Sequence, residues 1–162
     1  MKIVQPIKDL ETIEELKKLL SPRDSFMFTL GINVGLKISD ILDLKVKDVR
    51  GKESVTVIEK KSGKEKTYPI DRTLQEVIHN YTEGMDPESW LFPSRKGDKH
   101  ISRVQAHRIL SEAGDQLGVD ISTTSMRKTF GYHYFQRTGD IKKLQELFNQ
   151  SAPSTTRKYL NL

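Results

Sequence analysis

The stretch TTSMRKTFGYHYFQRTGD, residues 123–140, predicts one long helix that carries two adjacent cations. Its polar and apolar residues recur at amphipathic spacing, and Gly139 is the residue type that most often follows the end of a helix. Arg127 and Lys128 lie side by side early in this helix. Because a guanidinium is a planar fork of donors that suits a phosphate or a carboxylate, Arg127 is a candidate anion-binding residue.

The sequence before and after this stretch is also mostly helical in its periodicity. Apolar residues recur at helical spacing between Leu10 and Leu20, which predicts a first helix. The strongly apolar segment 24–34 predicts a second, buried helix that ends at Gly35. Further helices are expected to begin at cap or turn residues along the chain, namely Ser39, Asp71, Ser102, Asp140 and Pro153.

One region changes to the alternating pattern of β-strands. The runs SVTVIEKK (54–61) and KEKTYPI (64–70) are rich in β-branched residues and are joined at Ser62-Gly63, which predicts a hairpin with Lys61 at its tip. The expected fold class is therefore mainly α with a small antiparallel β-sheet (α+β). The length of 162 residues suits a single domain.

Composition limits the possible functions. Lys and Arg number 27 against 22 Asp and Glu, and the resulting charge of +5 is compatible with a polyanionic partner. The chain has no cysteine, which excludes disulfides and cysteine-based metal sites or nucleophiles. His79 and His107 lack neighbours of metal-ligand type, so no metal site is expected. No apolar run approaches the roughly 20 residues that span a bilayer, so we expect a cytoplasmic protein without a membrane partner.

Four stretches, in this order and spacing, carry a resemblance to a known family: GLKISDILDLKVKDV (35–49), KKSGKEKTYPI (60–70), TTSMRKTFGYH (123–133) and FNQSAPSTTRKYL (148–160). Together they resemble the catalytic domain of the tyrosine recombinases, the phage-integrase family. The resemblance covers most of the chain. Few residues precede the first motif, so we expect one catalytic-like domain over residues 1–162, without the separate N-terminal core-binding domain that the family usually carries.

The resemblance implies a mechanism and assigns residues to it. In this family a tyrosine attacks a DNA phosphodiester and forms a 3′-phosphotyrosyl bond, which conserves the bond energy, so that no cofactor is expected. Tyr159 matches that nucleophile and Arg127 matches the second arginine, which stabilises charge on the phosphate. Lys61 matches the hairpin lysine that protonates the leaving 5′-oxygen, and Asp40 matches the acidic residue after the first arginine motif.

Three positions depart from the family pattern. Lys37 replaces the first arginine, Thr124 replaces the histidine of the second arginine motif, and Gln150 replaces the histidine or tryptophan before the last helix. Lysine keeps the charge but lacks the bidentate fork, and threonine has no proton to exchange near neutral pH. These losses are expected to impair chemistry more than phosphate binding.

The resemblance also implies double-stranded DNA as the partner. The helix after the RKGDKH loop tends to face the DNA groove in this family, which makes Arg103, Gln105 and His107 candidate base or phosphate contacts. Lys128 is a further candidate DNA contact. Other protomers of a recombinase are possible partners.

Three functions remain open on the sequence. Retained Lys61, Arg127 and Tyr159 favour site-specific DNA recombination or integration, with an activity that the departures weaken. Lys37, Thr124 and Gln150 favour a degenerate member that binds DNA as a regulator without cutting it. A basic interaction domain that has lost DNA binding is the third alternative.

Overall fold

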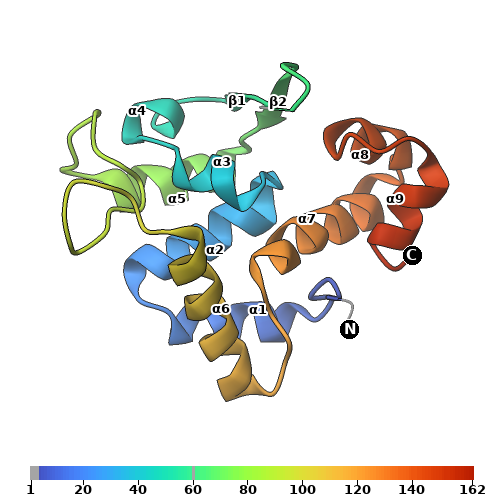
Figure 1. The fold of residues 1–162 in the computed structure, drawn as a ribbon, viewed down its shortest axis with the longest axis horizontal. Helices are drawn as coiled ribbons and strands as arrows, with labels where there is room; N and C mark the ends of the chain where they lie inside the picture. The colour runs from blue at the N-terminus through green and yellow to red at the C-terminus, as the bar shows by residue number, and fades with distance from the viewer. Residues whose placement is uncertain (1–3, 60) are drawn as a thin grey trace.

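Helix α2 (Pro22–Val34) lies at the centre of the fold in the computed structural model, which describes residues 4–59 and 61–162 (Figure 1). The side chain of Ser21 accepts a hydrogen bond from the backbone of Asp24 and starts this helix. Most of its residues are buried, including Phe28, which agrees with the high share of apolar residues in its sequence. The helix ends at Gly35, whose φ of 82° is in the left-handed region.

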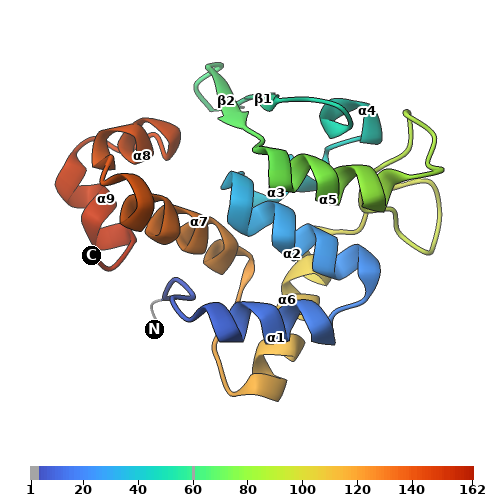
Figure 2. The same ribbon diagram turned by 180° about the vertical axis from the view of Figure 1, so that it is seen from behind.

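The other helices surround α2. Helix α7 (Thr123–Thr138), which the opening stretch predicts, packs along α2, and α1 (Leu10–Leu19) and α5 (Arg72–Thr82) cover other sides of it (Figure 2). Helix α6 (Arg103–Leu117) contacts α1, α3 (Ile38–Leu42) and α7. The C-terminal pair α8 (Ile141–Leu147) and α9 (Pro153–Tyr159) packs together beside α7.

The predicted hairpin is confirmed. Strands β1 (Ser54–Ile58) and β2 (Glu65–Pro69) pair antiparallel, with Ser54 opposite Pro69 and Ile58 opposite Glu65. Val55 and Tyr68 lie opposite each other on the buried face. Lys61 lies in the turn between the strands and is exposed. The hairpin stands on the side of the molecule above α2, with α8 across from it (Figure 1).

Most predicted caps are confirmed, but the region after Gly35 is not one helix that starts at Ser39. It forms two short helices, α3 (Ile38–Leu42), with Lys37 as its N-cap, and α4 (Val46–Val49). The helix is interrupted between them because the backbone groups there form hydrogen bonds with a loop that is distant in the sequence. Leu44 accepts a hydrogen bond from Leu91, and Val46 donates one to Ser89.

None of the helices within residues 4–59 and 61–162 is both long and apolar enough to cross a membrane. The apolar side chains collect instead in one core, which runs from α1 and α2 through α5 and α6 to α7, α8 and α9. This core fixes the relative positions of the helix ends that form the site.

Candidate active site

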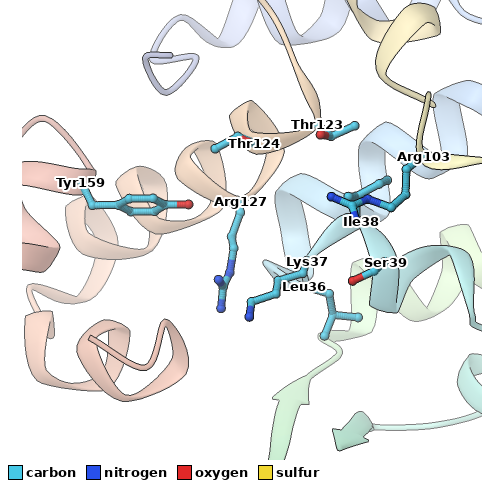
Figure 3. A pocket seen from close by; sticks show the side chains of 9 residues that line it. All are labelled: Leu36, Lys37, Ile38, Ser39, Arg103, Thr123, Thr124, Arg127 and Tyr159. Carbon is cyan, nitrogen blue, oxygen red and sulfur yellow. The ribbon is translucent and has the colours of Figure 1, made fainter. Parts of the chain in front are cut away.

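A pocket of about 210 Å³ opens where the α2–α3 connection, the starts of α6 and α7, and the end of α9 meet. Figure 3 shows Tyr159 on one side of it, Lys37 and Arg103 toward the other, and Arg127 between them. Segments far apart in the sequence thus bring a tyrosine and three cations to one place. The lining residues are Leu36, Lys37, Ile38, Ser39, Arg103, Thr123, Thr124, Arg127 and Tyr159.

Arg127 is held in a fixed orientation by the backbone. Its Nε donates to the Gly35 carbonyl at 3.0 Å, and its Nη2 donates to the Leu147 carbonyl at 2.9 Å. The guanidinium also lies over the Phe148 ring, 4.5 Å from its centroid. Because a guanidinium has five N–H donors, these bonds orient the group and leave it capacity for an anion. Arg127 is therefore a preorganised cation on the α7 side of the pocket.

Tyr159 is the last residue of α9 and is half-buried. Its ring meets the Phe148 ring edge to face at a centroid distance of 5.5 Å, so Phe148 contacts both Arg127 and Tyr159. The phenol oxygen points toward the pocket (Figure 3). Burial raises the pKa of Tyr159, and the nearby charge of Arg127 acts in the opposite direction. The hydroxyl is accordingly protonated at neutral pH and must lose its proton to act as a nucleophile.

Lys37 reaches the pocket from the N-terminus of α3. Its Nζ lies 4.0 Å from Oε1 of Glu59, at the end of β1, and its side chain is 43% exposed. The same Glu59 oxygen accepts a hydrogen bond from Asn149 at 3.2 Å. The sequence does not predict Glu59, Asn149 and Phe148 as site neighbours, because no motif marks contacts between residues so distant in the chain.

Two more of the predicted site residues, Thr124 and Arg103, line the pocket. Thr124 is exposed in the first turn of α7, and Arg103 is the first residue of α6. Arg103 also lines a second hollow of about 460 Å³ together with Val104, His107 and Thr123. Arg103 and Thr123 line both hollows and thus join the pocket to the exposed face of α6. Gln105 is half-buried there, and its backbone N–H serves the Ser102 cap.

Three predicted catalytic residues do not line the pocket. Lys61 lies in the exposed hairpin turn, and Asp40 lines a separate hollow with Asp43 and Asp48. Gln150 lies between α8 and α9, where its Oε1 accepts a hydrogen bond from Oγ1 of Thr156 at 2.6 Å. That bond leaves the amide nitrogen of Gln150 as the group able to donate.

Lys128 is buried and not on the surface, where a contact with DNA would require it to be. Its side chain is buried at 7% exposure, and its Nζ donates to the Val4 carbonyl at 2.8 Å. The same nitrogen lies 4.7 Å from the centroid of the Tyr159 ring. Residues 127 and 128 point in different directions because successive residues of a helix face different sides. Lys128 therefore supports the site from behind.

Within the described ranges, no group of three or more His, Cys, Asp or Glu residues is arranged to hold a metal ion. The groups that the pocket offers are guanidinium, ammonium, hydroxyl and phenol. Fixed cations around a tyrosine hydroxyl suit the binding of a phosphodiester and its attack by the tyrosine oxygen.

The fold and this set of groups define the catalytic domain of a tyrosine recombinase, and residues 7–162 match the model of the phage integrase family. The chain belongs to that family. It is 46% identical to the probable integrase/recombinase YoeC of Bacillus subtilis, over all of this chain and 92% of that protein. It is also 32% identical to the tyrosine recombinase XerA of Pyrococcus furiosus, of which it spans 59%.

Solved structures show the same fold. The XerA recombinase superimposes with a TM-score of 0.80 at 18% identity, over 98% of this chain and 61% of that one. The XerH recombinase bound to its palindromic difH substrate superimposes with a TM-score of 0.77 at 16% identity, over 98% of this chain and 49% of that one. The expected fold class and family are confirmed.

Proposed function

We propose that the protein is a site-specific DNA recombinase that cleaves and rejoins duplex DNA through a 3′-phosphotyrosyl intermediate on Tyr159. One observation carries the proposal: the Tyr159 hydroxyl faces the same pocket as Arg127, Lys37 and Arg103. Membership of the phage integrase family supports it. We place its action in the cytoplasm, on chromosomal or mobile DNA.

The chemistry requires a scissile phosphate in the pocket. The Tyr159 oxygen forms a bond to phosphorus, the bond from phosphorus to the 5′-oxygen breaks, and the phenol proton is lost to solvent. Arg127 and Lys37 stabilise the charge that grows on the non-bridging oxygens. The leaving 5′-oxygen takes a proton, for which Lys61 is the candidate donor. Attack by a 5′-hydroxyl on the phosphotyrosine reverses these bond changes and rejoins the strand.

Lys61 can take this role only after the hairpin turn moves toward the pocket. Gly63, next to the turn, has a φ of 69°, and an added Cβ there would contact nothing within 4 Å, so the turn stands free of the core. The free turn makes such a movement inexpensive. We therefore propose that DNA binding brings Lys61 to the leaving oxygen.

The departures from the family pattern affect the rate more than the binding. Thr124 lines the pocket but cannot exchange a proton near neutral pH, and acid-base help is typically worth about 10² to 10⁴ in rate. Lys37 supplies charge without the two parallel hydrogen bonds of a guanidinium. Slow cleavage is the expected outcome.

A suicide substrate tests the proposal. The DNA site is first selected from a random duplex pool, and a nick is then placed beside the scissile phosphate so that the short 5′ product diffuses away. We expect a covalent protein–DNA adduct with the wild-type protein. Tyr159→Phe should abolish the adduct and leave DNA affinity nearly unchanged. Tyr134→Phe, at another partly exposed tyrosine, is the matched control and should still form it.

Tight binding of the selected DNA without any adduct over long incubation, even with YoeC or XerA protein added, would contradict the proposal. That result would assign the protein to the second function, a regulator that binds DNA on the same surface without cutting it.

A further inference from the structure

A buried lysine lies over the ring of the candidate nucleophile. Lys128 of α7 places its Nζ 4.7 Å from the centroid of the Tyr159 ring, and the side chain is only 7% exposed. The Nζ donates to the Val4 carbonyl at 2.8 Å. Within residues 4–59 and 61–162 the structure thus pairs this ammonium with a carbonyl and an aromatic face. Neither partner carries a formal charge.

The carbonyl that holds Lys128 is itself fixed to α7. The backbone of Ile7 donates to Oγ1 of Thr129 at 2.9 Å, and its carbonyl meets Nε2 of His133 at 2.9 Å. Lys8 lies over the ring of Tyr132, 4.9 Å from its centroid. The segment from Val4 to Lys8 is therefore fastened along α7 and fixes the position of the Lys128 ammonium.

A lysine buried at this position does not favour the stability of the folded protein. Taking an ammonium out of water is costly, and a neutral side chain of the same length would fill the space without that cost. Burial accordingly lowers the pKa of Lys128. A cation over an aromatic face attracts the π-electrons, and the attraction is strongest away from water. The arrangement restrains the ring of Tyr159.

We propose that Lys128, held by the N-terminal segment, is a positioning residue for Tyr159. The inference rests on the proposed function, since it takes Tyr159 as the nucleophile. The Lys128 ammonium restrains the face of the ring while the Phe148 ring contacts it at a T-shaped angle, so that the phenol oxygen stays aimed at the pocket.

The same contact strengthens as the reaction proceeds. As the Tyr159 oxygen loses its proton and begins to bond to phosphorus, it carries partial negative charge, and part of that charge is delocalised into the ring. A cation over the ring stabilises this charge in the transition state. Lys128 itself transfers no proton and touches no DNA. Its effect should therefore appear in cleavage and not in binding.

The proposal predicts a distinct dependence on pH. The titratable group that faces the Lys128 ammonium is Tyr159 on α9. On the same side of the fold, His133 of α7 meets the Ile7 carbonyl and Lys8 of the N-terminal segment lies over the Tyr132 ring, while Arg127 acts on Tyr159. Because burial lowers the pKa of Lys128, the ammonium is lost at a lower pH than that of an ordinary lysine, as the pH rises through that lowered pKa. The contribution of Lys128 should vanish over the same pH range.

The experiment compares three variants of the full chain on the selected suicide substrate. Lys128→Met removes the charge at similar length, Lys128→Arg keeps a cation that stays protonated, and Lys142→Met, at an exposed lysine of α8, removes the same charge elsewhere. Lys128→Met should slow adduct formation about tenfold and change DNA affinity less than about twofold. Lys142→Met should leave the adduct rate unchanged. Lys128→Arg should keep most of the rate and, unlike the wild type, keep it at alkaline pH.

A second measurement does not depend on cleavage. The Tyr159 ring signals are assigned by NMR of the DNA-free protein through their loss in Tyr159→Phe. In the wild type these signals should shift as Lys128 loses its proton, and Lys128→Met should remove that transition.

Ring signals that are the same in wild type and Lys128→Met across the titration would overturn the proposal, whatever the cleavage result. An unchanged adduct rate in Lys128→Met, or losses of rate and affinity by the same factor, would overturn it as well. Absence of any adduct in the wild type, with the ring transition present, would instead contradict the function proposed for Tyr159 and leave the ring contact established.

Discussion

At the scale of single residues, the site combines retained and replaced groups around one pocket. Arg127 is fixed by two backbone carbonyls and the Phe148 ring, whereas Lys37 is 43% exposed and faces Glu59 at 4.0 Å. Glu59 itself is only 12% exposed, and it keeps the hydrogen bond from Asn149 when a phosphate draws the exposed Lys37 side chain away. Because lysine keeps the charge but lacks the bidentate fork of arginine, we expect ground-state binding to be preserved better than transition-state stabilisation.

Restoring the family residues should repair the chemistry. We expect the combined change Lys37→Arg, Thr124→His and Gln150→His to raise the rate of adduct formation by about 10² or more, and DNA affinity by far less. The restored groups act on charge and protons that develop only in the transition state. Rates from single-turnover cleavage and affinities from equilibrium titration provide the comparison. Equal gains in rate and affinity would show that the roles assigned to these positions are wrong.

At the scale of elements, the turn after α2 links the fold to the site. Gly35 has a φ of 82°, its carbonyl orients Arg127, and Lys37 follows two residues later. A Cβ at Gly35 would collide with the Phe130 ring of α7. The packing of α2 on α7 and the geometry of the pocket therefore depend on the same glycine.

Gly35→Ala should cost more stability than its backbone conformation alone explains. Gly118 ends α6 with a similar φ of 71°, but an added Cβ there meets nothing within 4 Å. Gly118→Ala is thus the control for backbone strain, at about 1 kcal/mol. Gly35→Ala should lose about 1–3 kcal/mol more of the free energy of unfolding through overpacking. Urea unfolding measures the free energy of unfolding of both variants. Equal losses would mean that the close approach of Phe130 to Gly35 does not contribute to the cost of the substitution.

The elements show what the sequence can and cannot predict. Helix ends such as Gly35, Asp71 and Ser102 were predicted correctly, because capping depends on residues only a few positions apart. The break between α3 and α4 was missed, because it depends on backbone hydrogen bonds to a loop far along the chain. The burial of Lys128 was missed for a similar reason, since it depends on the N-terminal segment and on Tyr159.

At the scale of the whole molecule, cations from three distant segments meet in one pocket of a chain with a net charge of +5. Of the seven catalytic positions that the family motifs predict, the fold brings four to one pocket: Lys37, Thr124, Arg127 and Tyr159. Lys61, which the motifs assign to the same site, lies in the exposed hairpin turn and is not among the residues that line the pocket. A motif specifies the order of residues in the chain. The position of an exposed turn in space depends in addition on what it binds, which is DNA in the function proposed here.

DNA binding should depend steeply on salt, because each neutralised phosphate releases counterions and contributes about 0.9 to the slope of log K against log salt. Arg103→Ala should lower that slope by about one phosphate contact, since Arg103 joins the pocket to the α6 face. Arg72→Ala, at an exposed arginine of α5 outside the pocket, removes the same charge and should leave the slope unchanged. Salt titrations by fluorescence anisotropy compare the two. A slope near zero in the wild type would contradict DNA binding altogether.

The most direct measurement is the identity of the amino acid that becomes joined to DNA. The trapped adduct is digested with protease and nuclease, and the modified peptide is sequenced by mass spectrometry. The account predicts one modified peptide, with a nucleotide 3′-phosphate on Tyr159. A nucleotide attached to any other residue, or to the 5′ end of the cut strand, would contradict the placement of the nucleophile at the end of α9.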